Sequence, residues 1–144
     1  MKFINLLLKL LPAKPVFAHC DIPCGIYDPQ SSQLASQTVL KMVQKLKELQ
    51  KPQEDKGWMD YKNSMIRMIL TKEQHAETCK REILILWTDY FKAEHLEKFP
   101  DLHTLVWQTT KLCSDNKRVV DEAKAQELIE AVDKIADIFN QTKK

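Results

Sequence analysis

Hydrophobic and polar residues alternate along most of the chain with the period of an α-helix. The first such stretch runs from about Ser32 to Leu49. Its apolar side chains share one face: Val39, Met42, Val43, Leu46 and Leu49. Residues 51–57 then break the pattern, because this segment is polar and contains both a proline and a glycine. The pattern predicts a helix followed by a turn.

A second periodic stretch runs from about Trp58 to Phe91 and is the longest in the chain. Its stripe advances in steps of three and four and includes one lysine. The members are Trp58, Tyr61, Met65, Ile69, Lys72, Ala76, Cys79, Ile83, Leu86 and Tyr90. A stripe of this kind is typical of a helix that packs in a bundle.

Two further helices are predicted after the polar connection Lys92–Phe99. The third follows Pro100 and carries Leu102, Leu105, Val106, Thr109 and Leu112 on one side. The polar run Cys113–Lys117 then predicts a turn with capping residues. The fourth helix, about Val119 to Gln141, is expected to bury Leu128, Ala131, Val132, Ile135 and Ile138. With no strand alternation in the sequence, residues 30–144 predict an all-α, antiparallel four-helix bundle.

Composition places the chain among ordinary globular proteins. Its 144 residues fit one domain, and 29% are charged. No apolar run reaches the eighteen or so residues of a membrane helix, so we expect a soluble protein without a membrane partner. The formal charge is +2, but residues 1–18 hold three lysines and no acid, so the rest of the chain is close to neutral. A nucleic-acid partner is therefore not supported.

The most specific feature lies next to this basic, leucine-rich leader. His19, Cys20 and Cys24 bring two thiols beside an imidazole. If the leader is removed after Ala18, His19 becomes the N-terminal residue and adds an amine to its imidazole. Cys20 then offers its amide nitrogen and its thiolate, and Cys24 offers a second thiolate.

These donors favour a square-planar metal. The amine, the amide nitrogen and the Cys20 sulfur form two fused five-membered chelate rings, the Cys24 sulfur completes the square, and the His19 imidazole can approach along the axis. Square-planar ligation indicates nickel or copper(II), whereas zinc prefers a tetrahedron. The alternative is a disulfide or redox pair, although the spacing departs from Cys-x-x-Cys. Cys79 and Cys113 lie on apolar helix faces and are expected to be buried thiols.

The run from His19 to Pro29, His-Cys-Asp-Ile-Pro-Cys-Gly-Ile-Tyr-Asp-Pro, resembles the nickel-binding hook of the nickel-containing superoxide dismutases. The segment from Leu86 to His103 is also similar to that family's central segment. The resemblance covers residues 19–144. It implies one nickel ion per subunit, held by a hook at residues 19–29, with His19, Cys20 and Cys24 as ligands.

The resemblance also implies roles for other residues and for the whole chain. Tyr27 would guard the open face of the metal, and Asp21 would shape its surroundings. Tyr90 would lie behind Tyr27 and hold its hydroxyl, and Lys92 would attract the anion. The hook would turn at a cis peptide bond before Pro23. The subunits would form a homohexamer. A dedicated maturation protease would remove residues 1–18 as a cytoplasmic pro-peptide. This leader also has weak features of a secretory signal, and if it acts as one, the protein would be exported.

One part of the family pattern is missing. A carboxylate and an arginine commonly orient the axial imidazole in the family, but the matching positions here are Ala35 and His75. We therefore expect other groups, His75 among them, to orient the ring. His95 and His103 lack the paired spacing of a zinc site, so we interpret them as structural or interfacial.

The leading hypothesis is a superoxide dismutase that cycles between Ni(III) and Ni(II). The alternative is a nickel or copper carrier that uses the same hook without turnover, and a thiol-redox protein ranks third. Tyr27, Tyr90 and Lys92 favour the enzyme, because a carrier would not need them.

Overall fold

The computed structural model describes residues 22–23 and 25–143. Its elements are α2 (Gln30–Glu48), α3 (Trp58–Ile85), the π-helical turn η1 (Leu86–Tyr90), α4 (Ala93–Lys98), α5 (Leu102–Arg118) and α6 (Glu122–Thr142). The described residues contain no strand. The predicted metal donors His19, Cys20 and Cys24, and also Asp21, lie outside this part of the chain.

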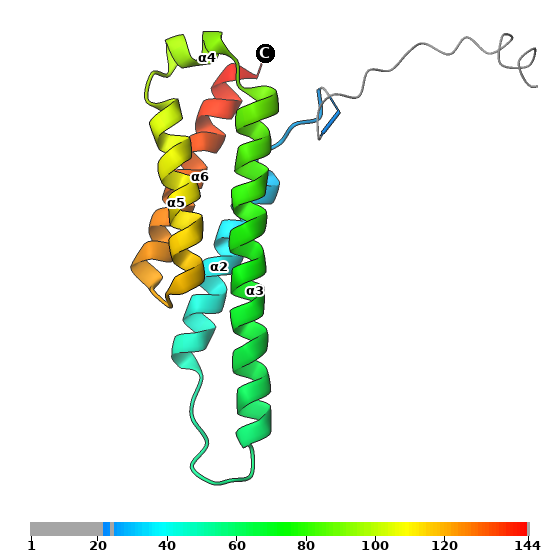
Figure 1. Cartoon of the computed structure of the whole chain (residues 1–144), viewed down its shortest axis with the longest axis vertical. Helices are drawn as coiled ribbons and strands as arrows, with labels where there is room; N and C mark the ends of the chain where they lie inside the picture. The colour runs from blue at the N-terminus through cyan, green and yellow to red at the C-terminus, as the bar shows by residue number, and fades with distance from the viewer. Residues whose placement is uncertain (1–21, 24, 144) are drawn as a thin grey trace, which may run out of the picture.

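The four long helices form an antiparallel bundle, as the sequence predicts (Figure 1). Around the bundle, α2 packs against α3, α3 against α5, α5 against α6, and α6 against α2. Neighbouring helices run in opposite directions, and α4 crosses one end of the bundle between α3 and α5 (Figure 1). The C-terminal ends of α3 and α6 and the start of α2 therefore lie at the same end.

Each helix contributes side chains of moderate size to one continuous core. The residues that are at most 4% exposed include Val39, Val43, Ala76, Cys79, Ile83, Val106, Cys113, Leu128, Val132 and Ile135. In α6 the expected burial of Ile138 is wrong: this side chain remains partly exposed, and its neighbour Phe139 is buried instead. Cys79 and Cys113 are buried free thiols, as expected. The neighbouring Cys113 thiol and the burial of the site both raise the pKa of Cys79, so it stays protonated and unreactive.

The predicted turn at Cys113–Lys117 is wrong, because α5 continues through it to Arg118. The polar side chains there have partners that suit a helix. Ser114 donates to the carbonyl of Thr110, and the Asn116 amide donates to the carbonyls of Leu112 and Lys124 at 3.0 Å. The turn comes later, and Asp121 caps α6 by accepting from the backbone N–H of Lys124.

Three further expectations need correction near the hook end. The polar connection after Lys92 contains the short helix α4. The second helix does not stay α-helical to Phe91, because it ends in a π turn closed by a bond from the Phe91 N–H to the Leu86 carbonyl at 2.9 Å. The described residues contain no cis peptide bond, so the bond before Pro23 is trans, the isomer of lower energy for a peptide on its own.

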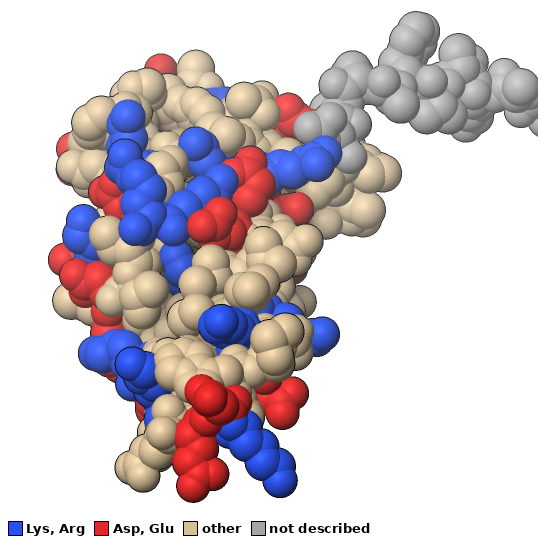
Figure 2. Space-filling model, turned by 60° about the horizontal axis from the view of Figure 1, so that its bottom comes forward, with Lys and Arg blue, Asp and Glu red and all other residues tan. Residues whose placement is uncertain are grey.

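The surface carries charges of both signs. Figure 2 shows lysine and arginine side chains mixed with acidic ones on the face in view, rather than gathered in one basic patch. Within residues 22–23 and 25–143, no helix is long and apolar enough to cross a membrane.

Candidate metal centre

The end of the hook is attached to the bundle by described residues. Ile22 packs against the core, and a turn is closed by a bond from the Ile26 N–H to the Pro23 carbonyl at 3.3 Å. Gly25 has φ +95°, a conformation that L side chains rarely adopt. Tyr27 is only 7% exposed. The residues on both sides of Cys24 are thus positioned at the bundle surface.

A cavity of about 730 Å³ lies beside this anchored segment, at the end of the bundle where α3, α4 and α6 meet. Its wall combines the hook end with the ends of three helices: Gly25, Tyr27, Asp89, Tyr90, Lys92, Glu94, His95, Lys98, Phe139, Gln141, Thr142 and Lys143. Three lysines and two carboxylates line it. This balance favours a small anion over a cation.

Tyr27 and Tyr90 meet in this wall, as the resemblance implies. Their ring centroids are 5.7 Å apart. Tyr90 is held by three more rings, with centroid distances of 4.4 Å to Phe139, 5.3 Å to Phe91 and 5.7 Å to His95. A ring packed on so many sides has little freedom to turn, so its hydroxyl is held in one place.

The direction of the Tyr90 hydroxyl follows from its hydrogen bonds. Tyr90 Oη and Thr142 Oγ1 are 2.9 Å apart, and Thr142 Oγ1 also lies 2.7 Å from the Phe139 carbonyl. The carbonyl can only accept, so the Thr142 proton goes to it. Thr142 must then accept from Tyr90, which leaves the Tyr90 oxygen as an acceptor toward the cavity.

Lys92 and His95 occupy the cavity rim together. Lys92 is exposed, and its backbone N–H donates to His95 Nδ1 at 3.2 Å. Because Nδ1 accepts, neutral His95 carries its proton on Nε2. His95, which the sequence indicated to be structural or interfacial, lines the same cavity as Tyr90. His103 instead packs against Trp87 in a tilted arrangement, with ring centroids 5.4 Å apart, and is absent from the cavity wall.

The two positions that depart from the family pattern, Ala35 and His75, both lie within helices. Ala35 is 1% exposed in α2. His75 lies on α3, and its Nδ1 is buried without a hydrogen-bond partner among the described residues. His75 is also absent from the cavity wall around Tyr90.

Sequence reasoning missed Thr142, and the chain offers no signal for it. Thr142 is 52 residues from Tyr90 in sequence and lies in the last turn of α6, so only the packing of α6 on η1 brings the two hydroxyls together.

The predicted donor set fits a nickel ion. Thiolates with amine, amide and imidazole nitrogens suit a square-planar metal of intermediate softness. Within the described part of the chain, no group of three or more histidine, cysteine or acidic side chains could hold a metal. Gly25 and Tyr27, the described residues that flank Cys24 on its C-terminal side, both line the cavity. The described segment on the C-terminal side of Cys24 thus borders the anion-favouring cavity.

Comparison with known proteins gives one consistent result. Residues 14–143 match the family model described as nickel-containing superoxide dismutase. The superoxide dismutase [Ni] of Streptomyces seoulensis is 37% identical over 133 residues, which cover 92% of this chain and 94% of that protein. The corresponding protein of Streptomyces coelicolor gives the same figures.

Solved structures agree with the sequence relatives. The native nickel superoxide dismutase structure at 1.30 Å is 36% identical, with a TM-score of 0.75, and the match covers 88% of this chain and 100% of the solved one. A structure with nickel ligation corresponding to the oxidized state is 35% identical, with a TM-score of 0.73, over 86% of this chain and 97% of that one.

Proposed function

Because the chain belongs to the nickel-containing superoxide dismutase family, we propose that its active form begins at His19 and that residues 1–18 are a leader removed on maturation. Residues 1–18 contain three lysines and no acid, and the match to the native solved relative covers 88% of this chain and 100% of that one. The domain would then consist of the hook at residues 19–29 and the bundle at residues 30–144.

The enzyme converts two superoxide ions and two protons into dioxygen and hydrogen peroxide. Its cofactor is nickel, one ion per subunit, which supplies the one-electron chemistry by alternating between Ni(III) and Ni(II). What the chain itself must supply is a ligand set, a path for a small anion and donors for the protons.

The proposed ligands are His19, Cys20 and Cys24, because they provide the donors that a square-planar nickel site needs. In the precursor the nitrogen of His19 is an amide, so one donor is missing until the leader is cut. The cut would therefore act as the activating step. A dedicated maturation protease would make it, and we place the mature enzyme in the cytoplasm.

The observation that carries the rest of the proposal is the contact of Tyr27 with Tyr90 in a cavity lined by three lysines. Lys92, on the rim, would draw superoxide inward by electrostatic attraction. The Tyr27 hydroxyl would orient the bound anion, with Tyr90 holding Tyr27 in position and Asp21 shaping the surroundings. We also propose that the subunits assemble as a homohexamer that partly shelters the hooks, since an eleven-residue polar hook is too short to fold alone.

The leader is tested most sharply by two proteins that differ by one residue. A chain that begins at His19 should bind nickel and dismutate superoxide, whereas a chain that begins at Ala18 should do neither well, because its amine is one residue too far away. In cells, Ala18→Pro should accumulate the precursor, and Ala13→Pro serves as a matched leader control. Mass and metal content of the protein purified from its own cell give the readout, and fractionation of that cell tests the location. Full activity with the leader attached would overturn the proposal.

The ligand assignment has its own test. Cys20→Ser or Cys24→Ser replaces a thiolate by a hydroxyl that stays protonated at neutral pH, so nickel redox cycling and turnover should be lost almost completely. Nickel content and absorption spectra of the folded variants distinguish lost binding from lost turnover. Retained activity in a Cys24→Ser protein would show that the hook is not the metal site.

A further inference from the structure

Helix α3 carries a second apolar stripe that faces solvent. Its members are exposed to 77% at Met59, 53% at Ile66, 59% at Leu70 and 40% at Leu84. At about 100° per residue these four positions fall within roughly 40° of one another. They lie roughly 120° around the helix from the core side chains of α3, such as Ala76 and Ile83. The helix therefore has two apolar faces, of which the bundle covers one.

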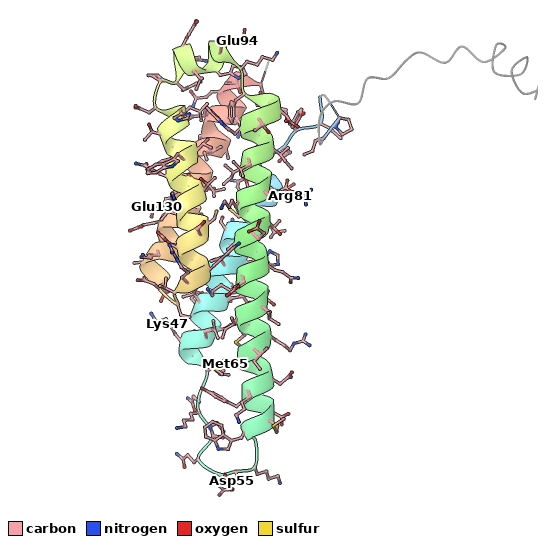
Figure 3. All side chains as sticks on the ribbon, in the orientation of Figure 1. Lys47, Asp55, Met65, Arg81, Glu94 and Glu130 are labelled. Carbon is pink, nitrogen blue, oxygen red and sulfur yellow. The ribbon has the colours of Figure 1, made fainter. Side chains whose placement is uncertain are left out.

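The N-terminal part of α3 is also the least covered part of the bundle. Figure 1 shows it extending beyond the ends of α5 and α6, with only α2 alongside. No residue from Trp58 to Thr71 is fully buried, and Met65, labelled in Figure 3 on this stretch, is only partly covered. Two helices alone leave apolar side chains in water, which a further layer would cover.

We propose that the N-terminal part of this second stripe, Met59, Ile66 and Leu70, binds the same helix of a second copy of the chain. The inference rests on the proposed homohexamer, because a closed assembly with two-fold axes needs a surface that is complementary to itself. An antiparallel pair of α3 helices, with the two-fold axis near residues 67 and 68, sets Ile66 against the partner's Leu70. Symmetry makes the same contact twice.

The charges that flank the stripe support this register. In the same antiparallel pair, Lys62 lies opposite the partner's Glu73, on one side of the apolar contact, and symmetry again repeats the pair. Both side chains are exposed, and neither forms an ion pair with another described residue. Acidic residues within the stripe's length, Glu73 and Glu77, disfavour a membrane of anionic lipids as the occupant.

A charge-reversal cycle in the mature, nickel-loaded protein tests the pairing. Lys62→Glu and Glu73→Lys each place like charges opposite each other twice, and each should raise the concentration at which the assembly dissociates about tenfold. The double variant Lys62→Glu/Glu73→Lys restores opposite charges and should return this concentration to about the wild-type value. Sedimentation velocity over a dilution series measures it. Glu130→Lys, on α6 diagonally across the bundle, makes the same charge change and should have no effect.

Leu70→Asp provides a second, independent measurement, because the side chain is exposed in the subunit and its loss should not disturb folding. It should dissociate the assembly while helix content by circular dichroism stays unchanged. If the wild-type protein is a stable monomer, the proposed hexamer itself is wrong. If the wild type is a hexamer that neither the charge reversals nor Leu70→Asp weakens, the hexamer stands and the α3 contact is wrong. If single reversals weaken it and the double variant does not restore it, the antiparallel pairing is wrong.

Discussion

Replacement of Lys72 by methionine should destabilise the bundle severely, although the lysine does not line the cavity around Tyr90. Lys72 is 1% exposed, and its ammonium donates to the carbonyls of Asn116, Lys117 at 2.9 Å and Val119 at 3.1 Å. These are carbonyls at the C-terminal end of α5, which lack partners within the helix. The cation also lies at the negative end of the helix dipole.

The size of the effect can be worked out from these contacts. Lys72→Met keeps the unbranched stem but leaves three carbonyls without their donor, at about 1 kcal/mol or more each. Loss of the favourable position at the helix end adds up to about 1 kcal/mol. An opposite effect reduces this loss. Burial lowers the pKa of Lys72, because removing the charged ammonium from water is unfavourable, and methionine has no charge to bury. The expected net loss is about 3 kcal/mol of unfolding free energy.

Urea unfolding of the two proteins at one protein concentration measures this loss. Lys80→Met is the matched control, because Lys80 also reaches from α3 to α5 but, within the described part of the chain, bonds only the Ser114 hydroxyl, at 3.2 Å and near the surface. The control should cost under about 1 kcal/mol. If Lys72→Met costs no more than Lys80→Met, the ammonium does not hold the end of α5 and the reasoning fails.

Three other predictions concern the site, the core and acid stability. Thr142→Val removes the acceptor of the Tyr90 hydroxyl and should lower kcat/KM about fivefold with the fold intact. Thr38, whose hydroxyl bonds the Leu34 carbonyl of its own helix, provides the control: Thr38→Val should leave kcat/KM unchanged, and equal effects of the two variants would refute the role of Thr142. Cys79→Ala should cost about 1–2 kcal/mol in urea unfolding and leave the nickel spectrum intact, and loss of nickel from the folded variant would contradict a site confined to the hook. Hydrogen bonds from Lys47 and Gln44 lower the pKa of Glu122. The ionised carboxylate therefore stabilises the folded protein above the ordinary pKa of glutamate, and this stabilisation disappears as the pH falls through the lowered pKa. Glu122→Gln should therefore flatten the acid limb of a stability–pH curve, and an unchanged limb would count against the pairing.

The helices and the metal donors could be predicted from sequence because both depend on local geometry. Core positions on a helix recur in steps of three and four, so most core side chains of the four helices can be predicted from the sequence, including the unusual Lys72 within an apolar stripe. Phe139 is an exception. Fused chelate rings form between adjacent residues and depend on covalent geometry alone. For that reason His19 and Cys20 already indicate a square-planar metal without any fold.

The rest was decided by partners far away in the chain. Ser114 and Asn116 predict a turn from their residue types, but Asn116 stays helical because its side-chain amide donates to the Lys124 carbonyl of α6. The π turn that ends the second helix and the contact of Tyr90 with Thr142 also have no signature in sequence. Each depends on which polar group another helix presents once the apolar faces have packed. Periodicity specifies which face is buried, but only the packed bundle determines which donors and acceptors meet there.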